Sequence, residues 1–151
     1  MRYSIAEESD APVVATLVNR LIEELGGSPL PSDEAHAAAA HLVGDTSAGF
    51  AVIAWDDTQP IGVCTVSFQH AIRTLGTYAT IQEMYVVPAW RSRQAGSQLV
   101  EIALAEAARH GCAMVELGTP PHGDRQITFY ERLGFRAVGQ RLRKTLQADG
   151  A

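Results

Sequence analysis

A strand, a short loop and a long amphipathic helix follow one another without interruption between Thr77 and His110. Thr77–Val87 is predicted to be a strand, the letters PAWRSRQA form the loop, and Gly96–His110 is the clearest helix of the sequence. The helix carries apolar residues on one face: Leu99, Ile102, Ala103 and Ala107. A strand that leads directly into such a helix is typical of a layered α/β fold.

The other predicted elements extend this pattern over nearly the whole chain. Turn residues and capping signals separate them. In order they are a strand at Tyr3–Ala6, a helix through Val13–Leu25, a helix from Ser32 to about Gly44, strands at Phe50–Trp55, Ile61–Phe68 and Cys112–Leu117, a helix at Asp124–Leu133, and a final hairpin of Phe135–Val138 with Gln140–Leu146. This order predicts one domain over residues 1–146, with a mixed sheet and helices on both faces, and a disordered tail at 147–151.

Composition excludes several classes of protein. The chain has 151 residues, 46% of them hydrophobic and 19% charged, which is typical of a globular domain. Its net charge of -5 argues against a nucleic-acid partner. The charge agrees with a cationic or small neutral substrate, and an acidic surface that simply keeps the protein in solution is the plainer alternative. Cys64 and Cys112 stand far apart and suit a reducing compartment. The first residues, MRYSIAEESD, contain no apolar segment, so we expect no leader, and no apolar run approaches the length of a membrane span. We therefore expect a cytoplasmic protein that does not enter a membrane.

The joint between the long strand and the long helix has the character of an anion site. Free backbone N–H groups and the positive end of the helix dipole point the same way there. The predicted donors are the amides of Gln94, Ala95, Gly96, Ser97 and Gln98, with the guanidinium groups of Arg91 and Arg93. The alternative is a plain capped helix with two solvated arginines. Neither GxxxxGK[ST] nor an early GxGxxG occurs, which disfavours a P-loop NTPase and a Rossmann dinucleotide site.

Two segments together resemble the GCN5-related N-acetyltransferase (GNAT) superfamily. They are IQEMYVVPAWRSRQAGSQLVEIAL and, about thirty residues later, ITFYERLGF. The family's loop motif, Arg/Gln-x-x-Gly-x-Gly/Ala, falls on Arg91 to Gly96. The resemblance implies the GNAT-like acyl-CoA N-acyltransferase fold, an α/β fold with a mixed, mostly antiparallel sheet flanked by helices. It also implies acetyl transfer from acetyl-CoA to an amine.

The same resemblance implies roles for particular residues. The pantetheine arm would pair with main-chain groups of Met84 and Val86, where the strand splays from its neighbour. Tyr130, in the FYE-type segment, would protonate the leaving thiolate. Glu83 is our candidate base for the amine, because a charged residue is unusual in the middle of a strand. Direct transfer is favoured over an acyl-enzyme intermediate.

Each role has a plainer alternative. Glu83 could pair with an arginine or reach solvent, and Tyr130 could simply pack beside Phe129 and Phe135. The motif also departs from the family: Gln94 replaces its first glycine, and Gly123 and Gln126 stand where Asn and Ala are frequent. If Gln94 needs a positive φ it carries strain, and if it is helical its N–H still serves.

Three functions remain open at this point. The first is an N-acetyltransferase acting on a small-molecule amine or a peptide. The second is a non-catalytic acyl-CoA-binding regulatory module on the same fold, and the third is a nucleotide-binding protein. His36 and His41 are five residues apart and do not share a helix face, so no metal site is expected. The last predicted strands would offer an edge for a homodimer.

Overall fold

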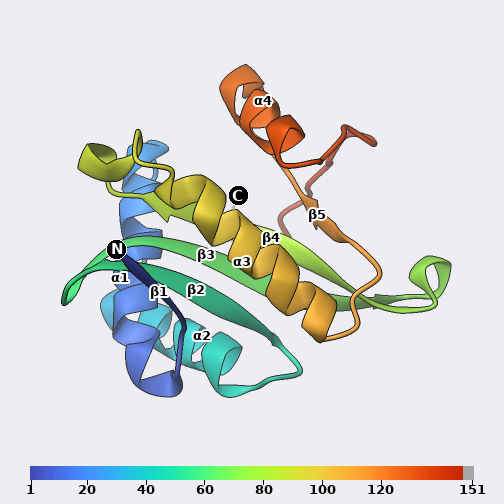
Figure 1. The fold of residues 1–151 in the computed structure, drawn as a ribbon. Helices are drawn as coiled ribbons and strands as arrows, with labels where there is room; N and C mark the ends of the chain where they lie inside the picture. Colours follow the sequence, from blue (N-terminus) through green and yellow to red (C-terminus); the bar gives the residue numbers. More distant parts are fainter. Residues whose placement is uncertain (148–151) are drawn as a thin grey trace. The chain divides into compact units, whose positions relative to one another are not determined.

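The computed structural model describes residues 1–147, which divide into two compact units at Leu117 and Gly118. The first unit holds a five-stranded sheet with strand order β1-β2-β3-β4-β5 (Figure 1). The strands are β1 Arg2–Ile5, β2 Gly49–Asp56, β3 Gln59–Ala71, β4 Gly76–Val86 and β5 Val115–Leu117. Neighbouring strands are antiparallel except β4 and β5, which are parallel, so the predicted mixed sheet is confirmed.

Three α-helices of the first unit cover the sheet from its two sides. They are α1 Ala11–Glu24, α2 Ser32–Gly44 and α3 Ala95–Arg109, and the 3-10 turns η1 Glu8–Asp10, η2 Ile72–Thr74 and η3 Pro88–Trp90 complete the connections. α1 and α2 lie on one side and α3 on the other (Figure 1). The helix α4, Asp124–Arg132, belongs to the second unit. No described helix is long and apolar enough to cross a membrane.

Alternation along β3 assigns side chains to the two faces of the sheet. A Cβ on Gly62 would lie 3.0 Å from Leu99 Cδ1, so the even-numbered residues of β3 near this point face α3. Val63 instead joins the core that α1 and α2 close, together with Tyr85 of β4. Both faces are therefore buried at the middle of the sheet, where Ile53 and Val63 have no exposed surface.

Two predicted strands differ from the structure. β5 is limited to Val115–Leu117 instead of Cys112–Leu117, because Gly111, with φ of +78°, turns the chain and Cys112 follows in that turn. The final hairpin is wrong: residues 135–147 contain no strand. A strand needs a neighbour to accept its hydrogen bonds, and the described part of the second unit offers none. The homodimer proposed through those strands loses that basis.

The single domain predicted for residues 1–146 stays a prediction. Of the predicted tail, residues 148–151 lie outside the described residues.

Candidate active site

The start of α3 presents three backbone amides without acceptors. The helix begins at Ala95, no side chain caps it, and its first regular bond runs from the amide of Gln98 to the carbonyl of Gln94 at 3.1 Å. The amides of Ala95, Gly96 and Ser97 therefore have no acceptor within residues 1–147. The expectation that the Gln98 amide is also available is wrong, because the helical ladder already uses it. Three parallel donors at a helix N-terminus suit an anion.

Gln94 occupies the left-handed region, with φ of 63° and ψ of 12°. This resolves the two conformations considered above: the position does require a positive φ, and glutamine adopts it at a cost of roughly 1 kcal/mol. Ser97 supports the turn, since its hydroxyl donates to the Gln94 carbonyl at 3.0 Å. The departure from glycine therefore changes the strain of the loop and leaves the helix start in place.

Arg91 ties the loop to the sheet and to α1. Its Nε donates to the carbonyl of Val86 at 2.8 Å, and its Nη2 lies 2.5 Å from Glu24 Oε1. The guanidinium also lies 5.6 Å from the ring centre of Tyr85. Arg91 thus holds the loop in position, and the Val86 carbonyl already has a donor.

The second arginine of the loop, Arg93, is differently placed. Its guanidinium stacks over Trp90 at 4.8 Å, and the residue is exposed. It takes part in no ion pair within the described chain. Arg93 is therefore the loop cation whose charge remains uncompensated.

The edge of β4 is open beyond Ile81 within the first unit. β5 pairs with β4 only across Ala79–Ile81 and ends at Leu117, so no strand of the first unit flanks Met84 or Val86 on that side. An open strand edge can pair with an extended ligand through main-chain groups. This geometry agrees with the predicted splay, while the binding roles of Met84 and Val86 stay predictions.

A β-bulge reorganises the middle of β4. Thr65 pairs with Glu83 and Val66 pairs with Ile81, so Gln82 is an extra residue on its strand. Regular alternation would place Gln82 on the face of Met84 and Val86, and the bulge prevents this. The side-chain amide of Gln82 donates to Ser67 Oγ at 2.8 Å, and this bond puts the Gln82 side chain on the face shared by Thr65 and Glu83. The bulge therefore brings two polar side chains of β4, Gln82 and Glu83, to one face.

The carboxylate of Glu83 is held by Thr65. The Thr65 hydroxyl donates to Glu83 Oε1, and it accepts a hydrogen bond from the main-chain N–H of Glu83 at 3.0 Å. Thr65 is only 1% exposed, whereas Glu83 is half-buried. The partner of the Glu83 side chain is thus a threonine, and no arginine pairs with it within residues 1–147. Sequence reasoning missed Thr65; the alternation of Thr65, Ser67 and Gln69 along β3 was the available signal.

The cysteines are poor nucleophiles. Burial raises the pKa of the Cys64 thiol to about 12, and the nearby Glu83 carboxylate adds to the effect. Desolvation also raises the pKa of Cys112. Because the thiolate is the reactive form, neither residue favours an acyl-enzyme route. Within residues 1–147 no group of three or more His, Cys, Asp or Glu side chains could hold a metal ion.

Tyr130 lies on α4 in the second unit. Its ring contacts Phe129 and Phe135 edge to face, at centroid distances of 5.0 and 5.5 Å. The aromatic packing considered for Tyr130 is therefore present, and it fixes the ring without testing the role of the hydroxyl group.

Gly123, one of the departures from the family motif, also lies in the second unit. A Cβ there would lie 2.9 Å from the Pro120 carbonyl oxygen and 3.2 Å from Gln126 Oε1. These contacts explain the small residue at this place.

The whole fold has close structural counterparts. An integron cassette protein from the mobile metagenome of Cole Harbour Salt Marsh superposes with a TM-score of 0.84 at 21% identity, over 97% of this chain and 90% of that one. The aminoglycoside N-acetyltransferase AAC(6')-Iy in complex with CoA gives 0.82 at 17%, over 97% and 95%. The ribosomal-protein-alanine N-acetyltransferase from Brucella melitensis biovar Abortus 2308 gives 0.72 at 16%, over 97% and 99%.

These structures show that the chain has the fold of the N-acetyltransferases. Residues 16–135 match the family model described as the acetyltransferase (GNAT) family, and the chain belongs to that family. No curated protein sequence matches significantly.

Proposed function

We propose that this protein transfers an acetyl group from acetyl-CoA directly to a primary amine of a small molecule. The observation that carries the proposal is the set of three amides at Ala95, Gly96 and Ser97 that have no acceptor within residues 1–147, in a member of the acetyltransferase family. They would hold the diphosphate of the coenzyme, since a helix N-terminus combines aligned donors with a favourable dipole. Arg93 would add the uncompensated positive charge of the loop.

The thioester would lie along the open edge of β4. The pantetheine arm can pair with the main chain at Met84 in the way an added strand would. A backbone N–H of that edge would also stabilise the oxyanion that forms when the amine attacks the thioester carbonyl. Arg91 would contribute mainly by fixing the position of the loop, because its guanidinium is already bonded to the Val86 carbonyl and the Glu24 carboxylate.

Glu83 would remove the proton from the attacking ammonium group, directly or through a water molecule. One of its oxygens is engaged by Thr65, which leaves the other for the substrate. The nitrogen then bonds to the acetyl carbon and releases its second proton to solvent, the carbon–sulfur bond breaks to leave the amide, and the thiolate of the coenzyme takes a proton. Tyr130 would supply that proton, since a phenol is protonated at neutral pH.

The experiment measures thiol release from acetyl-CoA over a panel of primary amines, beside calorimetry with CoA. We expect CoA binding and amine-dependent turnover, with Tyr130→Phe and Glu83→Gln losing turnover while keeping CoA affinity. CoA binding without turnover for any amine would favour the non-catalytic acyl-CoA module. Binding of ATP in place of CoA would favour the nucleotide-binding alternative, and no binding of either would refute the proposed site.

A further inference from the structure

A strip of polar side chains extends from Glu83 along the hairpin of β3 and β4. Ser67 and Gln69 come from β3, and Thr80 and Gln82 come from β4. All four lie on the same face of the sheet as Val63 and Tyr85. The helices α1 and α2 cover that face at Val63 and Tyr85. Ser67, Gln69 and Thr80 are half-buried and Gln82 is exposed, so the helices leave this part of the face accessible.

Hydrogen bonds order these side chains into one network. Ser67 Oγ accepts hydrogen bonds from the side-chain amide of Gln69 at 2.9 Å and from the side-chain amide of Gln82 at 2.8 Å. Thr80 donates to Gln69 Oε1 at 2.6 Å, so both the nitrogen and the oxygen of the Gln69 side chain take part in the network. The strip is therefore arranged before any ligand arrives, as in a preorganised binding site.

Several polar groups of the network remain free to bind a ligand, and among them are a donor on Ser67 and an acceptor on Gln82. The Ser67 hydroxyl has accepted two hydrogen bonds, so its own proton is left to donate. The Gln82 amide group donates to Ser67, while its Oε1 has no donor within residues 1–147. One donor and one acceptor thus stand side by side, joined by the 2.8 Å bond between the two residues.

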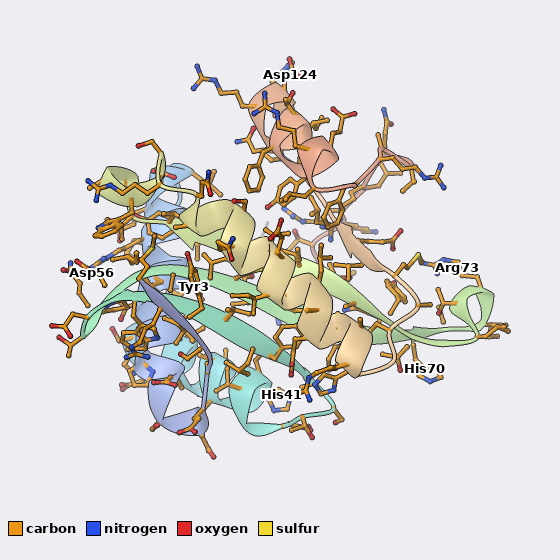
Figure 2. The ribbon with its side chains drawn as sticks, in the orientation of Figure 1. Tyr3, His41, Asp56, His70, Arg73 and Asp124 are labelled. Carbon is orange, nitrogen blue, oxygen red and sulfur yellow. The ribbon has the colours of Figure 1, made fainter. Side chains whose placement is uncertain are left out.

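The charges around the strip disfavour a second ion on the substrate. Glu83 is the carboxylate at one end of the strip. At the hairpin end, Glu116 is neutralised by Arg73 at 3.6 Å, and Arg73 stacks over Tyr78 at 5.0 Å. Figure 2 shows Arg73 and His70 together at that end of the hairpin, far along the strands from Asp56 at the β2–β3 turn. Ser67 and Gln82 lie between these two ends.

We propose that Ser67 and Gln82 bind a hydroxyl group of the acceptor, beside the amine that Glu83 receives. A hydroxyl is a neutral group that can accept from the Ser67 proton and donate to Gln82 Oε1 through a single atom. The acceptor class is then a hydroxylated primary amine, an amino alcohol or amino sugar. This inference rests on the proposed acetyl transfer and narrows its substrate.

The test compares monoamines that differ by one hydroxyl: ethanolamine with ethylamine, and 3-amino-1-propanol with propylamine. For the unaltered protein we expect kcat/KM to be about tenfold higher for the hydroxylated member of each pair, the effect of one or two neutral hydrogen bonds. Ser67→Ala and Gln82→Met should bring the ratio to within about twofold, with CoA affinity unchanged. Gln59→Met, at the exposed β2–β3 turn, is the matched control and should keep the preference.

Three outcomes would overturn the proposal, and they separate it from the proposed function. Turnover without a preference for the hydroxylated amines would refute the proposed acceptor class but would still support acetyl transfer. A preference that survives in both Ser67→Ala and Gln82→Met would place the recognition elsewhere. Absence of turnover with all four amines, together with no binding of them to the CoA-saturated protein in NMR titration, would refute both together.

Discussion

Thr65 and Glu83 are joined by two hydrogen bonds across adjacent strands, one from hydroxyl to carboxylate and one from amide to hydroxyl. The single hydroxyl group therefore fixes both the main chain and the side chain of Glu83. Because Thr65 is almost fully buried, this bond is shielded from competing water.

Replacement of Thr65 by valine keeps the shape of the side chain and removes the hydroxyl. We expect kcat/KM for the amine to fall about tenfold, because the Glu83 carboxylate loses its fixed orientation. Thr65→Ser should restore most of the activity, and CoA affinity should be unchanged in both variants. Steady-state kinetics with calorimetry measure these effects; an equal loss in the serine variant would assign Thr65 a packing role.

Gly96→Pro removes one amide of the proposed diphosphate site at a helix position that tolerates proline. The dissociation constant for CoA should rise about tenfold, the loss of one charge-assisted hydrogen bond. Gly96→Ala retains the N–H group and is the control. Calorimetry measures the affinity and circular dichroism verifies the fold; CoA bound equally by both variants would contradict the site.

Gln94→Gly relieves the left-handed conformation of the helix start. We expect the free energy of unfolding to increase by up to about 1 kcal/mol, because glycine adopts a positive φ without the Cβ clash. Gln94→Val should decrease it, since a β-branched residue is disfavoured there. Urea denaturation decides, and a glycine variant less stable than the native protein would show that the glutamine side chain outweighs the strain.

The two loop arginines should separate in their effects. Arg93→Gln is expected to weaken CoA binding several-fold, and increasingly at low salt, because its charge has no partner in the described chain. Arg91→Gln should instead lower stability by about 0.5–1 kcal/mol, the range for a half-exposed pair with Glu24 plus one hydrogen bond. If Arg91→Gln weakened CoA binding more than Arg93→Gln did, Arg91 would be the cation of the loop that binds the coenzyme.

The buried thiol of Cys64 predicts a loss of stability in base. Its pKa is raised from the ordinary value of 9.0 to about 12, so the folded chain keeps a proton that the unfolded chain releases. The free energy of unfolding should be unaffected by this group below pH 9 and should then fall by about 1.4 kcal/mol per pH unit up to about pH 12. Urea titrations of the native protein and Cys64→Ala test this: the difference in stability between them should change with that slope, and parallel curves would contradict it.

Local patterns predicted the two elements on which the proposed coenzyme site lies. The strand Thr77–Val87 and the helix Gly96–His110 agree with β4 and α3 to within a residue at either end. Their signals are short-range: a helix start, an apolar stripe and a terminal glycine. The family motif could be placed on this joint for the same reason.

Contacts between distant residues account for what was missed. Arg91 is held by Glu24, which lies 67 residues earlier in the chain, and no local pattern indicates that pair. The bulge at Gln82 depends on how β3 pairs with β4, so regular alternation assigned this residue to the wrong face. The final hairpin failed likewise, because β-propensity alone does not supply a neighbouring strand.

The boundary after Leu117 divides the proposed chemistry along the chain. The residues that would receive the amine and grip the coenzyme precede it, and the phenol of Tyr130 follows it. A chimaera in which the segment from Gly118 onward is exchanged for that of another acetyltransferase should therefore change the rate at which the coenzyme thiol leaves. Such a hybrid would inherit its choice of amine from the first 117 residues, which makes this junction a natural place to recombine family members.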